Sequence, residues 1–219
     1  MNLFVLRTMV SFKKELTLSL GVIVLLTLLP LIAVIEIANG GVAAASDSLA
    51  HVDPITHLIT IYDPKGNIET TMQATTVWPV GGVVTLEFGA SDLPYQAAHT
   101  GIDIADPEGK IGRPITTFMD GIVSKVMNTD NEYGRYVFVD HGNNIQSQYW
   151  HLSEALVTVG QKVKPGDVIG LEGETGHATG PHLHFQIDVY GIPINPRIFE
   201  VGSPPSGLDN PKIIAGVSR

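Results

Sequence analysis

The chain has no cysteine among its 219 residues and carries few positive charges. The missing cysteine excludes disulfide bonds and thiolate metal sites, so a metal would have to be bound by nitrogen or oxygen ligands. The 22 acidic residues outnumber the 13 Lys and Arg residues and give a formal net charge of −9. Because nucleic acids bind to basic surfaces, this balance argues against a nucleic-acid partner.

Long amphipathic helices and internal repeats are also missing from the region after residue 75. Short β-prone runs marked off by glycine recur there instead, at residues 120–127, 135–140, 145–152, 157–163, 167–171 and 182–189. This pattern predicts a mainly β domain with antiparallel sheet and a groove.

The chain has one long apolar run, residues 16–35, which contains no charged side chain. A helix of this length rises about 1.5 Å per residue and crosses roughly 30 Å, the hydrocarbon thickness of a bilayer. Arg7, Lys13 and Lys14 precede the run, so the positive-inside tendency places the N-terminus in the cytoplasm. We therefore expect a single-pass membrane anchor with the rest of the chain outside the cytoplasm.

A cleaved signal peptide is the alternative to this anchor. Ala43, Ala44 and Ala45 offer a small-residue processing site, and cleavage near Ala45 would release a secreted protein. The apolar core of a signal peptide usually has about 7–15 residues, which is shorter than this run, so we favour the anchor. The following domain is exported in either case.

Three groups of histidine and carboxylate residues lie in the exported region. They are His99 with Asp103, His151 in a Tyr-Trp-His-Leu run, and His182 with His184 in a Gly-Pro-His-Leu-His-Phe run. Side chains two or four positions apart lie on one face of a β-strand, so each pair can present both members to a common centre. Such an arrangement is suited to a metal site.

Residues 182–189 alternate between polar and apolar side chains without interruption. This period of two predicts a half-buried strand. We expect its apolar face to meet the core and its polar face, with both histidines, to line the groove.

A catalytic zinc site typically has three nitrogen or oxygen ligands from the protein and a fourth position for water. His99, Asp103 and one histidine of the 182/184 pair supply that number. The other member of the pair and His151 then remain for proton transfer or for contacts around the ligands. This chemistry alone leaves open which of the two binds the metal.

The three motifs His99-x-Gly101-x-Asp103, Tyr149-x-His151-Leu152 and His182-x-His184 resemble, in order and approximate spacing, those of lysostaphin-type (LytM-like) zinc endopeptidases. Those enzymes cleave peptidoglycan peptides. The resemblance extends over about residues 78–196 and includes the glycine-rich stretch before the last motif. It implies the antiparallel groove domain of that family and a Zn²⁺ cofactor.

Position by position, the resemblance makes His99, Asp103 and His184 the zinc ligands and leaves His151 and His182 as catalytic histidines. All five are present. Degenerate relatives that have lost ligands act as regulators of other hydrolases, so the intact set favours an active enzyme.

Three further positions qualify this interpretation. Gln186 stands where similar proteins often carry Glu, which bears on rate or specificity more than on the fold. His141 is interpreted as a turn residue. For His177, in the loop before the last motif, substrate contact and simple exposure are both open.

The resemblance implies a zinc-dependent endopeptidase that hydrolyses stem peptides or cross-bridges of peptidoglycan, held in a bacterial cell membrane with its catalytic domain extracytoplasmic. A catalytically silent wall-binding or hydrolase-activating protein is the first alternative, and a partner in an envelope complex stays unidentified. Residues 159–170 also resemble a turn of biotinyl and lipoyl carrier domains. A carrier needs a modifiable lysine in a tight hairpin, which we do not find.

The expected organisation is a cytoplasmic tail at 1–15, a transmembrane helix at 16–37, a tether and β-hairpin at 38–75, the metallopeptidase domain at 76–200 and a flexible tail at 201–219. The hairpin is predicted from Leu58–Tyr62 and Asn67–Thr71, which flank an Asp-Pro-Lys-Gly turn. It would either pack on the catalytic domain or shield its groove.

Overall fold

The computed structural model describes residues 46, 48–90, 98–129 and 134–199. In these parts of the chain no helix is long and apolar enough to cross a bilayer. The expected membrane helix at 16–37 and the two tails at 1–15 and 201–219 lie outside the described residues, so these expectations stay predictions.

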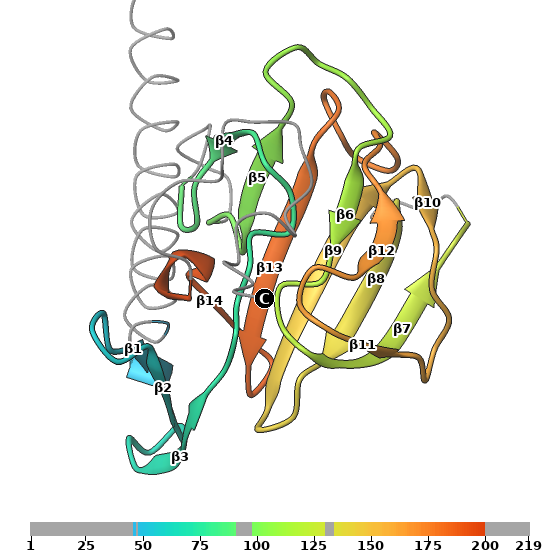
Figure 1. The fold of residues 1–219 in the computed structure, drawn as a ribbon. Coiled ribbons are helices and arrows are strands. Elements are labelled where there is room, and N and C mark those ends of the chain that lie inside the picture. Colours follow the sequence, from blue (N-terminus) through green and yellow to red (C-terminus); the bar gives the residue numbers. More distant parts are fainter. Residues whose placement is uncertain (1–45, 47, 91–97, 130–133, 200–219) are drawn as a thin grey trace, which may run out of the picture.

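Within the described residues, fourteen β-strands form three antiparallel sheets, and a 3-10 helix follows the last strand (Figure 1). The large sheet has the order β11 (Lys162–Val163), β7 (Gly121–Met127), β8 (Arg135–Asp140), β9 (Ile145–Leu152), β13 (Leu183–Val189), β5 (Ile102–Ala105) and β4 (Val83–Leu86), and β14 (Ile192–Ile194) also pairs with β13. The mainly β, antiparallel fold predicted from the sequence is confirmed.

A small sheet packs on one face of the large one. Its order is β10 (Glu154–Ala155), β12 (Val168–Leu171) and β6 (Pro114–Thr116). Figure 1 shows β6 and β12 in front of the strands of the large sheet. Phe118, just after β6, places its ring 5.7 Å from that of Phe185 on β13, and Tyr149 on β9 lies 5.4 Å from the same ring. These contacts lie in the apolar core, which leaves the opposite face of β9 and β13 for the polar residues.

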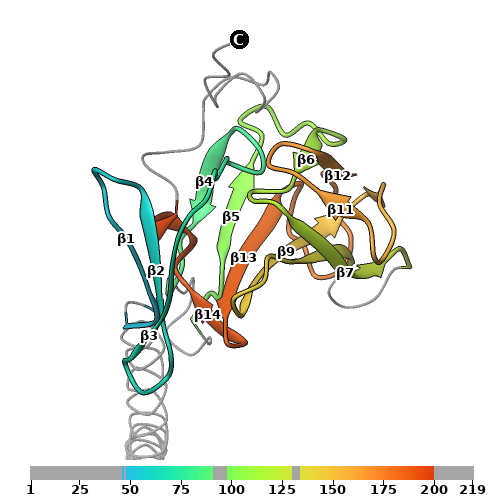
Figure 2. The same cartoon turned by 60° about the horizontal axis from the view of Figure 1, so that its bottom comes forward.

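The third sheet consists of β1 (Ala50–Val52), β2 (Leu58–Tyr62) and β3 (Ile68–Gln73). The predicted hairpin is confirmed by the antiparallel pairing of β2 with β3. At its turn the carboxylate of Asp63 accepts the N–H groups of Lys65 and Asn67. Buried Ile59 and Ile61 belong to the same core as the large sheet, so the hairpin packs on the domain near β14 and the 3-10 helix Pro196–Ile198 (Figure 2).

The predicted strands at 135–140 and 145–152 are confirmed with the same bounds, and they pair antiparallel. The prediction for 157–163 is wrong, because only Lys162–Val163 is a strand. The N–H of Gln161 donates to the carbonyl of Thr158, and Gly160 has φ +87°. A tight turn therefore interrupts that run.

Strand β9 contains a β-bulge opposite Tyr136. Val137 pairs with Tyr149 whereas Arg135 pairs with Leu152, so β9 has one residue more than β8 between these pairs. His151 takes φ +64° there. Tyr149 and Leu152 both reach the core, and Trp150 and His151 between them are partly exposed. Strict alternation would have placed His151 on the same side as Tyr149, so the bulge is what brings this histidine to the polar face.

Candidate metal centre

Two neighbouring strands and the segment before one of them bring His99, Asp103 and His184 together. Asp103 on β5 and His184 on β13 are cross-strand partners. The expectation that His99 and Asp103 share a strand is wrong, because β5 begins at Ile102. His99 is held instead by backbone hydrogen bonds with Gly89 and Ala90.

Gly101 explains why this segment can pass so close to β13. A Cβ atom at position 101 would lie 2.4 Å from the carbonyl oxygen of Phe185 and 2.9 Å from His184 Nε2. Both distances are shorter than van der Waals contact allows. A larger residue would therefore push His99 away from His184, which gives the glycine of the His-x-Gly-x-Asp motif a steric reason.

The ligand atoms of the three residues lie within hydrogen-bonding distance of one another. His99 Nε2 is 3.1 Å from Asp103 Oδ1 and 2.9 Å from His184 Nδ1, and His184 Nδ1 is 2.9 Å from Asp103 Oδ1. In a tetrahedral site with metal–ligand distances of about 2.0–2.2 Å, ligand atoms are separated by roughly 3.3 Å. The observed triangle is close to that size.

The other ring nitrogens indicate which atoms are free to bind a metal. His99 Nδ1 lies 3.2 Å from the carbonyl oxygen of Glu87, which can only accept, so this nitrogen carries the proton and Nε2 has a lone pair. His184 Nε2 faces Gln186 Oε1 at 3.5 Å, which leaves a lone pair on Nδ1 in the same way. Two lone pairs and a carboxylate then face one another, and a cation between them satisfies all three. The donor set fits Zn²⁺.

Asp103 is the charged member of this group, and its side chain is 15% exposed. Burial by itself would raise the pKa of Asp103. When the N–H groups of protonated His184 and His99 face the carboxylate in place of a cation, their hydrogen bonds and charges outweigh burial and hold the pKa of Asp103 well below its usual range. The carboxylate is therefore ionised, as a metal ligand must be.

His182 and His151 adjoin the centre without belonging to the triangle. His182 lies one residue before β13, in a bridge with Gly173, and its Nε2 is 3.7 Å from Asp103 Oδ2. The His151 ring lies 4.7 Å from the His182 ring and 6.2 Å from the His184 ring. Burial lowers the pKa of His151 to about 4, against the opposing effect of its hydrogen bond to the carbonyl of Thr175, so the ring is neutral at neutral pH.

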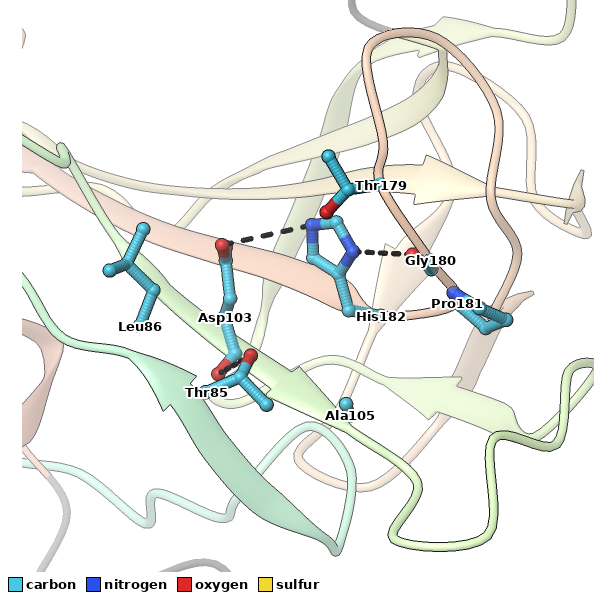
Figure 3. Close-up of a pocket in the computed structure, with 8 residues that line it drawn as sticks. All are labelled: Thr85, Leu86, Asp103, Ala105, Thr179, Gly180, Pro181 and His182. Atoms are coloured by element: carbon cyan, nitrogen blue, oxygen red, sulfur yellow. Dashed lines mark hydrogen bonds and ion pairs between the residues drawn. The ribbon is translucent and has the colours of Figure 1, made fainter. Parts of the chain in front are cut away.

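A cavity of about 300 Å³ opens beside Asp103 and His182 (Figure 3). Small, apolar and hydroxyl residues from β4, β5 and the loop before β13 line it together with one carboxylate and one histidine; the lining residues are Thr85, Leu86, Asp103, Ala105, Thr179, Gly180, Pro181 and His182. Figure 3 shows Asp103 and His182 directed toward each other within this space. A substrate in the cavity would thus lie against the proposed metal ligand Asp103 and against His182, a free histidine in the sense that it is not one of the proposed ligands.

Residues 97–196 match the sequence model of peptidase family M23. This region is an M23 peptidase domain. Family M23 is zinc-dependent, in agreement with the ligand trio. The domain includes the three proposed ligands and the two proposed catalytic histidines. The structure places His151 and His182 beside the triangle of His99, Asp103 and His184.

Several proteins that the M23 domain resembles are named peptidases. Over 100 residues it is 49% identical to the peptidoglycan DD-endopeptidase ShyA of Vibrio cholerae, a match that covers 45% of this chain and 22% of that protein. A zinc-containing peptidase from Vibrio cholerae aligns with 30% identity and a TM-score of 0.52, covering 67% of this chain and 47% of that one. Lysostaphin from Staphylococcus simulans aligns with 27% identity and a TM-score of 0.50, covering 57% of this chain and 53% of that one. The chain spans 22–25% of the length of the first curated relatives that it matches.

A hydrogen-bonded chain on the polar face of the M23 domain supports His184. Gln186 Oε1 accepts the Thr100 hydroxyl at 2.6 Å and faces His184 Nε2, and Gln186 Nε2 donates to Asp188 at 2.7 Å. Gln148 donates to the other oxygen of Asp188. A Glu at position 186 would put two carboxylates in contact, so the departure from the family pattern fits the neighbouring acid.

The other two histidines that the sequence singled out lie apart from the ligands. His177 is exposed and does not line the cavity. His141 follows β8 and is hydrogen-bonded to the carbonyl of Asp120 and to Ser147. The interpretation of His141 as a turn residue agrees with this position.

Sequence reasoning missed the residues that orient the two free histidines in the M23 domain. His151 Nδ1 donates to the carbonyl of Thr175, and His182 Nδ1 donates to the carbonyl of Gly180, both at 2.8 Å. Backbone carbonyls leave no side-chain signature. The only signal was the Gly-x-Thr-Gly spacing of the loop, which the resemblance had included without assigning a role.

Proposed function

We propose that this chain is a zinc-dependent endopeptidase that hydrolyses peptide bonds in peptidoglycan. One arrangement carries the proposal: ligand atoms of His99, Asp103 and His184 lie within 3.1 Å of one another, and His151 and His182, each bound through Nδ1 to a backbone carbonyl, adjoin them beside a cavity. The names of the M23 relatives support the substrate class.

His99, Asp103 and His184 would hold the ion. Bound zinc supplies a Lewis acid that polarises a carbonyl and lowers the pKa of water to about 7. His151 and His182 each commit Nδ1–H to a backbone carbonyl, so proton exchange falls to their Nε2 atoms. Either ring can accept the proton of the attacking water on Nε2. Once protonated there, it can donate to the oxyanion and return that proton to the leaving amine.

We further propose that the scissile bond is a link between D-amino acids in the stem peptides. The sequence analysis left stem peptides and cross-bridges open as substrates, and a cross-bridge of the glycine-rich kind is the alternative to this link. The 49% identity to ShyA, named a DD-endopeptidase, against 27% identity to lysostaphin supports the first. The small cavity beside Asp103 is consistent with small side chains next to the scissile bond.

The location of the enzyme is a proposal from the sequence. The apolar run at 16–35 would anchor it in a bacterial membrane, with residues after 37 extracytoplasmic and within short reach of the wall. Alkaline washing of membranes should leave the full chain in the pellet, and protease added to spheroplasts should remove the domain. Release of a chain shortened to about residue 46 would support signal cleavage instead.

The test of the catalytic proposal uses the full-length chain purified in mild detergent. Its zinc content is measured, and soluble products from purified peptidoglycan are identified by mass spectrometry. We expect about one zinc per chain and cleavage of D–D cross-links. His184→Ala should lower both zinc content and product release at least tenfold, roughly, because a ligand is lost.

His177→Ala is the matched control, since His177 is exposed in the neighbouring loop and does not line the cavity. It should keep both properties. Bound zinc without products from several wall types would favour the silent binding or activator protein. Undiminished release by His184→Ala would refute the ligand assignment.

A further inference from the structure

Both free histidines are oriented by one loop, residues 173–181, which connects β12 to β13. Thr175 supplies the carbonyl that accepts from His151 Nδ1, and Gly180 supplies the carbonyl that accepts from His182 Nδ1. A carbonyl oxygen only accepts, so each Nδ1 carries a proton and Nε2 is the ring nitrogen that is left for another partner. The position of the loop therefore decides which nitrogen of each ring can take up a proton.

The side chain of Thr175 ties this loop to the large sheet. Its hydroxyl donates to the carbonyl of Leu152 on β9 at 2.7 Å and accepts the N–H of Arg135 on β8 at 2.9 Å. Arg135 and Leu152 form one cross-strand pair, which lies next to the bulge at His151. One hydroxyl thus connects the loop to both strands at the point where the bulge turns His151 toward the centre.

Gly134 makes room for this contact. It has φ +69°, and a Cβ atom there would lie 2.4 Å from the carbonyl oxygen and 2.5 Å from the hydroxyl of Thr175. The residue before β8 must therefore be small for Thr175 to reach the sheet. The close approach indicates that the position of Thr175 is defined from both sides.

We propose that Thr175 is a positioning residue for proton transfer. Its hydroxyl anchors the loop to β8 and β9, and its carbonyl thereby holds His151 in the Nδ1–H tautomer with Nε2 toward the metal centre. The catalytic meaning of this role rests on the proposed function, whereas the tautomer can be measured independently of any reaction.

The test compares Thr175→Val, which removes both hydroxyl contacts at nearly constant volume, with Thr175→Ser, which keeps the hydroxyl. The ring nitrogens of ¹⁵N-histidine-labelled, zinc-loaded full-length protein are observed by NMR, and His151→Asn assigns the His151 signals. We expect the Nδ1–H tautomer in the wild type and in Thr175→Ser. Thr175→Val should show a substantial population of the Nε2–H form.

Kinetics on a soluble cross-linked muropeptide give the second measurement. Thr175→Val should lower kcat roughly tenfold to a hundredfold while KM and zinc content stay unchanged, because contacts around a site act on orientation. Thr175→Ser should recover kcat to within about twofold of the wild type. Thr158→Val, at an exposed turn position, controls for the loss of a threonine hydroxyl elsewhere.

The proposal is overturned if wild-type His151 carries its proton on Nε2, a result that needs no variant to fold. It is also overturned if Thr175→Val folds with the wild-type tautomer and kcat. A wild type with the Nδ1–H tautomer and no muropeptide products would remove the proposed function but leave the tautomer assignment standing.

Discussion

His141 and His151 lie at opposite ends of the β8–β9 hairpin and share two properties. Burial lowers the pKa of each to about 4. Each also faces a backbone carbonyl with Nδ1, that of Asp120 at 2.7 Å for His141 and that of Thr175 at 2.8 Å for His151. Both rings are therefore neutral at neutral pH, with the proton on Nδ1.

The two histidines differ in their second nitrogen. His141 Nε2 lies 2.7 Å from Ser147 Oγ, which lies 2.9 Å from the hydroxyl of Tyr149, and that oxygen accepts the N–H of Phe118. A neutral His141 lets the serine and tyrosine hydroxyls each donate once along this buried chain. For His151, the hydrogen bond found among the described residues involves Nδ1 alone, and the ring adjoins the rings of His182 and His184. A lowered pKa alone thus does not identify a catalytic histidine; the direction of the second nitrogen does.

The largest expected effect is on activity and comes from His151→Asn. Asparagine tolerates positive φ, so the bulge at φ +64° is retained while the proton acceptor is lost. We expect product release to fall about 10²- to 10⁴-fold with unchanged zinc content. Assays of muropeptide release together with thermal unfolding check this. Wild-type activity in the folded variant would mean that His151, like His141, has no catalytic role.

The second prediction concerns pH and His141. The unfolded chain binds a proton on this ring below about pH 6.5, whereas the folded protein stays neutral down to a pKa of about 4. The unfolded state therefore binds more protons in this window, so His141 lowers the free energy of unfolding as the pH falls from 6.5 to 4. The full effect is on the order of 3 kcal/mol. Urea unfolding at several pH values measures it.

His141→Gln is the control for this window. It lacks a titrating ring, so its free energy of unfolding should depend less on pH by that amount, while activity per folded molecule is kept. Since His151 titrates in the same direction, the difference between wild type and variant isolates His141. Identical pH dependence in the two proteins would show that the buried chain tolerates the charged ring.

The smallest expected effect comes from Ser147→Ala. Ser147 is fully buried, and its hydroxyl connects His141 with Tyr149. Removing it should lower the free energy of unfolding by about 1–2 kcal/mol and leave activity per folded molecule unchanged. Thermal unfolding and muropeptide release are the measurements. A selective loss of activity would mean that the His141 end of the hairpin is coupled to the metal centre.

Much of the fold could be read from local pattern. The alternation along 183–189 and the β-prone runs at 135–140 and 145–152 predicted β13, β8 and β9. The expectation that β13 is half-buried was wrong beyond His184, because Gln186 and Asp188 on its polar face are buried as well. The strand predicted at 157–163 was wrong because the apolar residues there lie on either side of a turn at Gly160 and do not form one continuous strand. Local composition does not distinguish these two cases.

The candidate site was predicted in part. The family resemblance named His99, Asp103 and His184, and their ligand atoms do converge. The geometric argument for His99 was wrong, since His99 precedes β5 and reaches the centre through a loop that Gly101 brings against β13. Thr175 was given no role because its contribution depends on backbone groups of Arg135 and Leu152, which are distant in sequence.

The sequence by itself determined the ligand chemistry, because a chain without cysteine can offer a metal only nitrogen and oxygen. It also determined the alternation that separates the core face from the polar face of β13. Only the tertiary structure decided that His151 leaves the core side and that its Nε2 is the free nitrogen. A bulge and a loop carbonyl set these, and both arise from the register between strands that no local pattern encodes.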